Sequence, residues 1–252
     1  MASFFFYVGR LMSITIHEIM NHQGEKLDYT LHEAEKETNQ LLVIGHGVTG
    51  NKDRPLIVAL ANAVAEKGIH ALRFSFSGNG TSEGKFTDCC ISKEIEDLGC
   101  ILDALNGFEI SYAGHSMGGA VGVLKTANDP RIKRLISLAG MVHTQAFAER
   151  EFGNENPDEG VMWENQDCPL SSIYMNDMAE INTVTPQASQ VQVPWLLIHG
   201  VEDDVVPLKD SQDVLTHAND PVELFQIEGA DHVFDGSATK IMCQKAADWL
   251  TS

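Results

Sequence analysis

The run "YAGHSMGGAVG" (112–122) contains the spacing G-x-S-x-G, with Ser116 at its centre. It follows a β-favouring stretch and opens a predicted helix, which is the setting of a nucleophile elbow, where flanking glycines permit a strained turn that exposes the serine hydroxyl. A serine at its ordinary pKa is a weak nucleophile, so it needs a base that a carboxylate orients. The pattern alone also fits a glycine-rich turn whose serine caps the helix. Residues elsewhere in the chain are needed to distinguish a nucleophile elbow from a capping turn.

A candidate acid and a candidate base follow Ser116 in the order that a nucleophile elbow requires. Asp203 and Asp204 come directly after the predicted strand at 193–200, and His232 lies in the loop after the next strand. We favour Asp203 over Asp204 for its position in "GVEDDVVP", although both acids also fit a turn. The three residues predict acyl transfer, in which His232 takes the proton of Ser116 and Asp203 holds the imidazole. Because His232 must be neutral, we expect activity to fall below about pH 6 to 7.

Two backbone N–H groups must bind the oxyanion of such a reaction. We expect one from Met117, the residue after the nucleophile. We expect the other from Val48 in the turn "HGVTGNK" (46–52), which follows the predicted strand at 40–47. This turn carries neither G-K-[ST] nor G-x-G-x-x-G, so it does not indicate a phosphate site.

Further residues are candidates for contact with the substrate or with a metal. We predict substrate contacts from Gly47, His143, Trp163 and Tyr174, with packing inside a cap as the alternative for the aromatic residues. The histidines form no metal-spaced cluster, and the five cysteines are scattered without a C-x-x-C pair. We therefore predict reduced thiols, no metal and no cofactor.

A sheet of parallel strands has to position these residues. Short apolar runs rich in β-branched residues alternate with helical patterns, which predicts buried parallel strands with helices on both faces. Alternation at 14–21 and 26–34 around "HQGE" predicts an N-terminal hairpin. The predicted strands are 40–47, 69–77, 108–116, 132–140 and 193–200, and the predicted helices are 54–68, 91–107, 118–130, 208–220 and 237–250.

One interval interrupts this alternation. Residues 141–190 are far more than a connection between a strand and a helix needs, which predicts a cap or lid insertion, with a solvated excursion as the alternative. Residues 12–140 and 191–252 would then form the core. We expect residues 1–11 to be a disordered extension, with the functional chain beginning at Met12.

The overall charge restricts the partners. The 252 residues include 36 Asp and Glu against 17 Lys and Arg, a formal net charge of −19, which repels nucleic acid and anionic membrane surfaces. No run approaches a membrane-spanning length, and the start of the chain is a poor signal peptide. We therefore expect a cytoplasmic protein with a small-molecule ester substrate and no nucleic acid or membrane partner. The sequence leaves open whether the protein forms a homodimer.

Five motifs occur in one order along the chain: "HGVTGNK", "LRFSFSGNGTSEGKF", "GHSMGG", "HGVEDDVVP" and "GADHVF". Together they resemble the α/β-hydrolases over residues 12–252, and most closely the serine esterase branch that includes cinnamoyl and feruloyl esterases. This resemblance implies an α/β-hydrolase fold, with a mostly parallel eight-stranded sheet and a small cap inserted after the sixth strand. It also implies a carboxylesterase for small to medium acyl or aromatic acids.

Three alternatives to this activity stay open. The same triad could act on a monoglyceride, a thioester, or a peptide bond as in an aminopeptidase. A dehalogenase or epoxide hydrolase shares the fold but uses a carboxylate nucleophile, which Ser116 argues against. A ligand-binding protein could keep the triad with little turnover.

Overall fold

A mostly parallel sheet of seven strands forms the centre of the computed structural model, which describes residue 14 and residues 16–252. The strands are β3 (Tyr29–His32), β4 (Gln40–Gly45), β5 (His70–Phe74), β6 (Glu109–His115), β7 (Ile132–Leu138), β8 (Trp195–Gly200) and β9 (Val222–Ile227). Their order is β3-β5-β4-β6-β7-β8-β9, and β3 at one edge runs antiparallel to β5 while the other pairs are parallel. The expectation for residues 1–11 lies outside the described residues.

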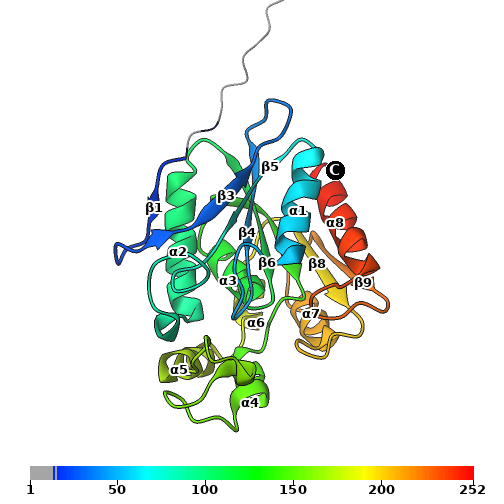
Figure 1. Ribbon diagram of the computed structural model, residues 1–252. Helices are drawn as coiled ribbons and strands as arrows, with labels where there is room; N and C mark the ends of the chain where they lie inside the picture. Colours follow the sequence, from blue (N-terminus) through cyan, green and yellow to red (C-terminus); the bar gives the residue numbers. More distant parts are fainter. Residues whose placement is uncertain (1–13, 15) are drawn as a thin grey trace, which may run out of the picture.

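Helices cover both faces of the sheet (Figure 1). The main helices are α1 (Pro55–Glu66), α2 (Ile91–Ala104), α3 (Met117–Thr126), α7 (Leu208–Leu215) and α8 (Ser237–Leu250). Successive side chains of a strand point to opposite faces. Accordingly, Leu42 and Ile44 of β4 pack into one core with α1 and α8, while Leu41 and Val43 pack into the other with α2 and α3. The strands and helices expected from residue 40 onward all form.

The prediction of an eight-stranded sheet is wrong, because the described residues supply seven strands. β1 (Ile19–Met20) and β2 (Lys26–Leu27) pair only with each other, in a separate two-stranded sheet. The hairpin lies against α2, where Ile19 and Leu27 are buried. The side-chain amide of Asn21, in the turn of the hairpin, donates to Asp97 of α2 at 2.9 Å. These contacts hold the hairpin on the helix and off the sheet edge.

The connections that follow β4 and β6 pass over opposite faces of the sheet. After β4 it passes through α1 on one face to β5, and after β6 it passes through α3 on the other face to β7. Two neighbouring parallel strands whose connections diverge leave a crevice at their carboxyl ends, the usual place for a ligand in such folds. The turn at 46–52 and Ser116 both lie at this crevice.

Residues 139–194, between β7 and β8, form α4 (Thr144–Phe152), η2 (Met162–Glu164), α5 (Ser172–Ile181) and α6 (Thr185–Ala188). Figure 1 shows α4 and α5 together at one end of the molecule, away from most of the sheet. Aromatic side chains hold this segment together, since the Phe152 ring lies 4.9 Å from that of Trp163 and 6.0 Å from that of Tyr174.

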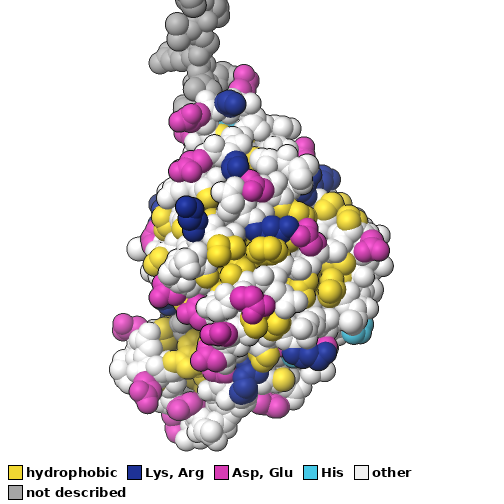
Figure 2. Space-filling model, turned by 90° about the vertical axis from the view of Figure 1, so that its right-hand side faces the viewer, with side chains coloured by type: hydrophobic (Ala, Val, Ile, Leu, Met, Phe, Trp, Pro, Cys, Tyr) yellow, Lys and Arg dark blue, Asp and Glu magenta, His cyan; other side chains and the backbone are white. Residues whose placement is uncertain are grey.

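The surface carries acidic side chains over much of the face turned toward the viewer in Figure 2, around a central band of hydrophobic ones. All five cysteines are free and buried. No helix within the described residues has the length and apolar character that a membrane crossing needs.

Candidate active site

Ser116 occupies a strained turn between β6 and α3. Its backbone has φ 54° and ψ −119°, a conformation that costs energy in a residue other than glycine. The turn is held in place by Ser116 N–H, which donates to Leu138 O at 2.9 Å, and by Met141 N–H, which donates to Ser116 O at 3.0 Å. Gly118 is required here because a Cβ would lie 2.6 Å from the carbonyl oxygen of His46. The local geometry is therefore that of the expected elbow.

Asp203 and His232 form a hydrogen-bonded pair. His232 Nδ1 lies 2.8 Å from Asp203 Oδ2, while Asp203 Oδ1 accepts the N–H groups of Val205 and Val206 at 2.9 and 2.8 Å. Burial alone would raise the pKa of Asp203, but hydrogen bonds from His199, His232 and Val206 hold it well below its ordinary value. Asp203 therefore stays ionised, whereas its neighbour Asp204 is exposed and makes no such contact.

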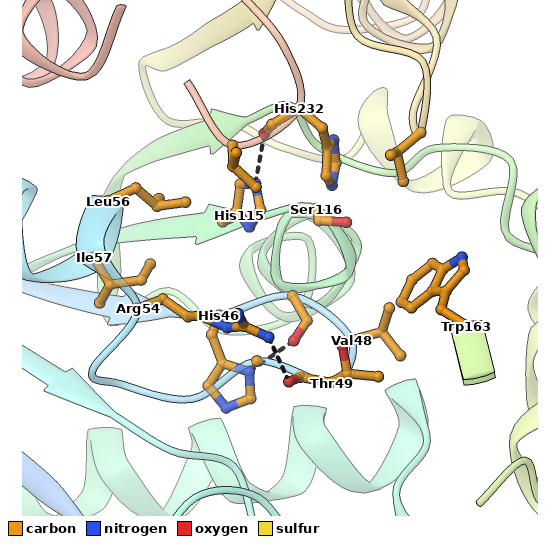
Figure 3. A pocket seen from close by; sticks show the side chains of 14 residues that line it. His46, Val48, Thr49, Arg54, Leu56, Ile57, His115, Ser116, Trp163 and His232 are labelled. Atoms are coloured by element: carbon orange, nitrogen blue, oxygen red, sulfur yellow. Dashed lines mark hydrogen bonds between the residues drawn. The ribbon is translucent and has the colours of Figure 1, made fainter. Parts of the chain in front are cut away.

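This pairing fixes the tautomer of His232. A carboxylate only accepts hydrogen bonds, so Nδ1 carries the proton and Nε2 presents a lone pair. His232 and Ser116 line the same pocket (Figure 3), and no hydrogen bond between their side chains is found in the described structure. Resting sites often show such loose geometry between a nucleophile and its base. A proton acceptor and a hydroxyl thus share one cavity.

His46 orients the turn that follows β4. Phe76 N–H donates to His46 Nε2 at 3.1 Å, so Nδ1 carries the proton and donates to Gly47 O at 2.8 Å. Gly50 N–H also donates to Gly47 O. Since the C=O and N–H of one trans peptide point in opposite directions, both bonds turn the N–H of Val48 away from them. Burial lowers the pKa of His46 to about 4, which keeps the neutral tautomer in place.

The two expected oxyanion donors are close to the elbow and unengaged. A Cβ on Gly47, next to Val48, would lie 2.8 Å from Ser116 Cβ, so this turn directly adjoins Ser116. Met117 begins α3, and the first N–H groups of a helix have no partner within it. Among the described residues, neither the N–H of Val48 nor that of Met117 donates to a backbone oxygen in a turn, loop or helix cap.

A pocket of about 340 Å³ opens beside Ser116. Four of the predicted site residues line it together with Ser116, namely Gly47, Val48, Trp163 and His232. Figure 3 shows the side chains of Ser116 and His232 on one side of the pocket and Trp163 on another. The remaining lining residues are His46, Thr49, Gly50, Arg54, Leu56, Ile57, His115, Val205 and Val233.

The structure does not bring the other two predicted substrate contacts to this pocket. His143 lies outside its lining, and His143 Nε2 is 3.2 Å from Asp213 Oδ2. Tyr174 is buried and lines a separate cavity of about 10 Å³, which it shares with Val48 and Met117. Its hydroxyl has no hydrogen-bond partner in the described structure.

Three further residues lie at the site: His115 and His199, whose positions at the ends of predicted strands favour packing or hydrogen bonding beside it, and Arg54, for which the sequence indicates no role. His115 donates from Nε2 to the backbone oxygen of His232 at 2.9 Å, which holds the loop that carries this base. His199 contacts the loop of Asp203, and Arg54 lines the pocket. Arg54 could have been found from its position immediately before the proline that begins the helix after the turn at 46–52. In the described chain, no group of three or more His, Cys, Asp or Glu is arranged to hold a metal ion.

Comparison with known proteins places this chain among hydrolases. A Mycoplasma genitalium protein described as an esterase/lipase is 29% identical over 208 residues, which are 70% of this chain and 77% of that protein. The mitochondrial palmitoyl-protein thioesterase ABHD10 of Bos taurus is 25% identical over 206 residues, which are 74% of this chain and 64% of that protein. Est1E from Butyrivibrio proteoclasticus, solved with ferulic acid bound, matches with a TM-score of 0.83 at 26% identity, over 93% of this chain and 98% of that one.

Family models agree with these individual matches. The model of the α/β hydrolase fold matches residues 40–161, and that of the prolyl oligopeptidase family matches residues 104–252. The chain therefore belongs to the α/β hydrolase fold and, through a match to more than half of its residues, to the prolyl oligopeptidase family.

Proposed function

We propose that this protein is a serine carboxylesterase that cleaves esters of small to medium acyl or aromatic acids through an acyl-enzyme. The observation that carries the proposal is the Asp203–His232 hydrogen bond of 2.8 Å, which leaves His232 Nε2 as a base in the pocket that Ser116 lines. The similarity to an esterase/lipase and to Est1E with ferulic acid supports the substrate class.

In the first half of the proposed cycle, Ser116 Oγ attacks the ester carbonyl while His232 Nε2 takes its proton. Asp203 stabilises the imidazolium that forms. The carbonyl oxygen becomes an oxyanion and accepts hydrogen bonds from the N–H groups of Val48 and Met117. His232 then gives the proton to the alcohol oxygen, and the C–O bond breaks.

In the second half, water attacks the acyl-enzyme and His232 takes a proton from it. The second oxyanion uses the same two N–H donors, and its collapse releases the acid and returns the proton to Ser116. Of the groups used, Ser116, His232 and Val48 line one pocket, Asp203 is hydrogen-bonded to His232, and Met117 follows Ser116 in the chain.

We further propose residues 141–190 as a cap over the core formed by 12–140 and 191–252. Trp163 of this segment lines the pocket with an exposed indole, which packs against the Phe152 ring at an interplanar angle of 60°. Its Nε1–H donates to Glu151 at 3.1 Å, so the cap fixes the ring from two sides. An acyl chain or an aromatic ring could pack against this surface.

Two other acyl substrates have specific support. The match to the prolyl oligopeptidase family favours cleavage of a peptide or amide bond as a second candidate. The similarity to a palmitoyl-protein thioesterase favours a thioester as a third. All three reactions use the same nucleophile and base, so only the leaving group and the acyl chain distinguish them.

A panel of esters, thioesters and aminoacyl amides tests the proposal, with acyl chains of increasing length and hydroxycinnamates included. We expect the highest kcat/KM for esters, and a loss of roughly 10⁴ to 10⁶-fold in kcat for Ser116→Ala. Ser189→Ala is the matched control, because the Ser189 hydroxyl is exposed and donates only to Pro186 O.

Labelling with a fluorophosphonate identifies the nucleophile directly, and it should modify Ser116. Faster cleavage of the amides would replace the esterase by a peptidase. Tight ligand binding without labelling would indicate a binding protein of this fold. Full activity in Ser116→Ala would refute the nucleophile assignment.

A further inference from the structure

The pocket beside Ser116 differs in charge from the rest of the chain. The chain has a formal net charge of −19, yet no Asp or Glu is among the residues that line this pocket. The lining contains one group with a permanent charge, the guanidinium of Arg54. A positive group in an uncharged pocket, within a strongly acidic protein, indicates selection for a negative group on the ligand.

Arg54 is held at the pocket without being neutralised. Its Nη2 donates to the backbone oxygen of Thr49 at 3.0 Å, and Figure 3 shows the side chain reaching toward that residue below Ser116. No ion pair of Arg54 exists in the part of the chain that the structure describes. A guanidinium has five N–H donors, so most of them stay available for a carboxylate.

Asp53 and Glu151, which lie next to Arg54 in the chain and beside Trp163 of the pocket lining, respectively, are both paired with other cations. Asp53 pairs with Lys52 and Arg73. Glu151, which contacts the indole of Trp163, pairs with Arg150. Each of these acids therefore already has a cation as its partner.

The helix that Arg54 precedes adds to the positive field. Arg54 is the N-cap of α1, whose first turn contains no acidic residue, and Leu56 in that turn lines the pocket. The start of a helix carries a partial positive charge. Burial lowers the pKa of His46 to about 4, and the charge of Arg54 acts in the same direction.

We propose that Arg54 makes this pocket selective for esters that carry a single carboxylate, whose oxygens accept N–H groups of the guanidinium. The inference rests on the proposed ester hydrolysis and names its substrate class. The substrate should carry no more than one negative charge. Residues 141–190 contain nine Asp and Glu against Arg150 alone and would repel a polyanion.

Two pairs of esters test the proposal, each differing only in whether the carboxylate is free or methylated. 4-Acetoxybenzoate and its methyl ester carry it on the alcohol half, and phenyl hydrogen succinate and its methyl ester carry it on the acyl half. The measured quantity is kcat/KM of the anionic ester over that of the neutral one. Comparing this ratio between wild type and a variant cancels the intrinsic reactivity of the esters.

We expect Arg54→Gln to lower this ratio roughly five- to tenfold for at least one pair, as for a partly exposed hydrogen bond between charged groups. The affected pair shows which half of the ester faces Arg54. Arg54→Lys keeps the charge and should retain part of the selectivity. Added salt should lower the ratio in wild type more than in Arg54→Gln, since it screens an exposed charge.

The matched control is Lys209→Gln, which removes one positive charge from an exposed side chain outside the pocket. It should keep the wild-type ratio. An equal ratio in wild type and Arg54→Gln for both pairs would overturn the proposal. An equal change in Lys209→Gln would also overturn it, because the effect would then come from the net charge.

A binding measurement separates this inference from the proposed function. Calorimetry gives the Kd of 4-acetoxybenzoate for Ser116→Ala and for the same variant with Arg54→Gln added, without any need for turnover. We expect weaker binding to the double variant, and equal affinities would refute the role of Arg54. If the wider ester panel shows no hydrolysis and the fluorophosphonate does not label Ser116, the proposed function fails, and this comparison of affinities still tests the role of Arg54.

Discussion

His199 Nε2 lies 3.3 Å from Asp203 Oδ2, the oxygen that also accepts the hydrogen bond from His232 Nδ1 at 2.8 Å. The same nitrogen of His199 is 2.9 Å from the backbone oxygen of Val206, which can only accept, so Nε2 carries the proton. Nδ1 must then accept from the hydroxyl of Ser211 at 2.7 Å. Ser211 therefore completes the hydrogen bonding of the tautomer that directs an N–H toward the Asp203 carboxylate.

Ser211→Ala should impair catalysis without touching the substrate. It removes the hydrogen-bond partner of a buried imidazole nitrogen, which we expect to cost about 1 to 2 kcal/mol, or roughly five- to thirtyfold in kcat. KM should stay unchanged, because Ser211 and His199 lie outside the lining of the pocket. Rates of ester hydrolysis at saturating and at low substrate concentrations give kcat and KM separately. An unaltered kcat, or a loss confined to KM, would contradict this role.

Asp203→Asn and Asp204→Asn form a pair of variants that each lose one negative charge at neighbouring positions. In Asp203→Asn the amide can donate to His232 Nδ1 and stabilise the wrong tautomer, so we expect kcat to fall roughly 10³ to 10⁴-fold. Asp204 is exposed, and its replacement should leave kcat near that of wild type. Similar losses in both variants would show that net charge, and not the contact with His232, is responsible.

The features that the sequence predicted well are encoded locally. β4, β6 and β8 are short apolar runs buried on both faces, and each ends where glycines or acids force the chain to turn. The elbow and the order of Ser116, Asp203 and His232 follow from these strand ends. Parallel strands carry their C-terminal ends to one edge, so positions in the chain translate directly into positions in space.

The features that the sequence missed depend on contacts between distant segments. Nothing in the alternating pattern at 14–21 shows that Asn21 bonds to Asp97, or that this contact holds the hairpin on α2. The contact between His199 and Ser211 joins the end of β8 to the middle of α7, and no motif encodes it. Arg54 was visible as a charge after a turn, but only the folded chain shows that it lines the pocket and forms no ion pair among the described residues.

His115 should make the protein sensitive to mild acid. Burial lowers the pKa of His115 to about 3, and the charge of His232 acts in the same direction, whereas an unfolded histidine has a pKa of about 6.5. Between these values the unfolded chain binds a proton that the folded chain does not. The free energy of unfolding therefore decreases as the pH falls, by about 1.4 kcal/mol per pH unit for this one group.

His115→Gln should remove that contribution. The free energy of unfolding, measured by urea titration between pH 4 and 6, should then change less steeply with pH than in wild type, by the equivalent of about one proton. His217→Gln is the control, because it removes an imidazole that is exposed. An unchanged slope in His115→Gln would mean that the folded protein already protonates His115.

Glu94 should make the protein less stable as the pH rises. It is 1% exposed on α2, and neither carboxylate oxygen has a hydrogen-bond partner among the described residues. Burial raises the pKa of Glu94 well above its ordinary value, and the charges of Asp97 and Asp177 add to this. Above about pH 4.5 the unfolded chain loses a proton that the folded chain keeps, so the free energy of unfolding decreases with rising pH until the folded carboxyl ionises as well.

Glu94→Gln cannot ionise, so it should be more stable than wild type at pH 8 by at least about 1 kcal/mol, with a smaller difference at pH 4. Glu96→Gln makes the same substitution at an exposed position of the same helix, so it should show no such dependence on pH. Urea unfolding of the three proteins at both pH values measures the difference. A wild type that is more stable than Glu94→Gln at pH 8 would require a stabilised carboxylate at this position. That result would contradict the absence of a hydrogen-bond partner for the Glu94 carboxylate in the described structure.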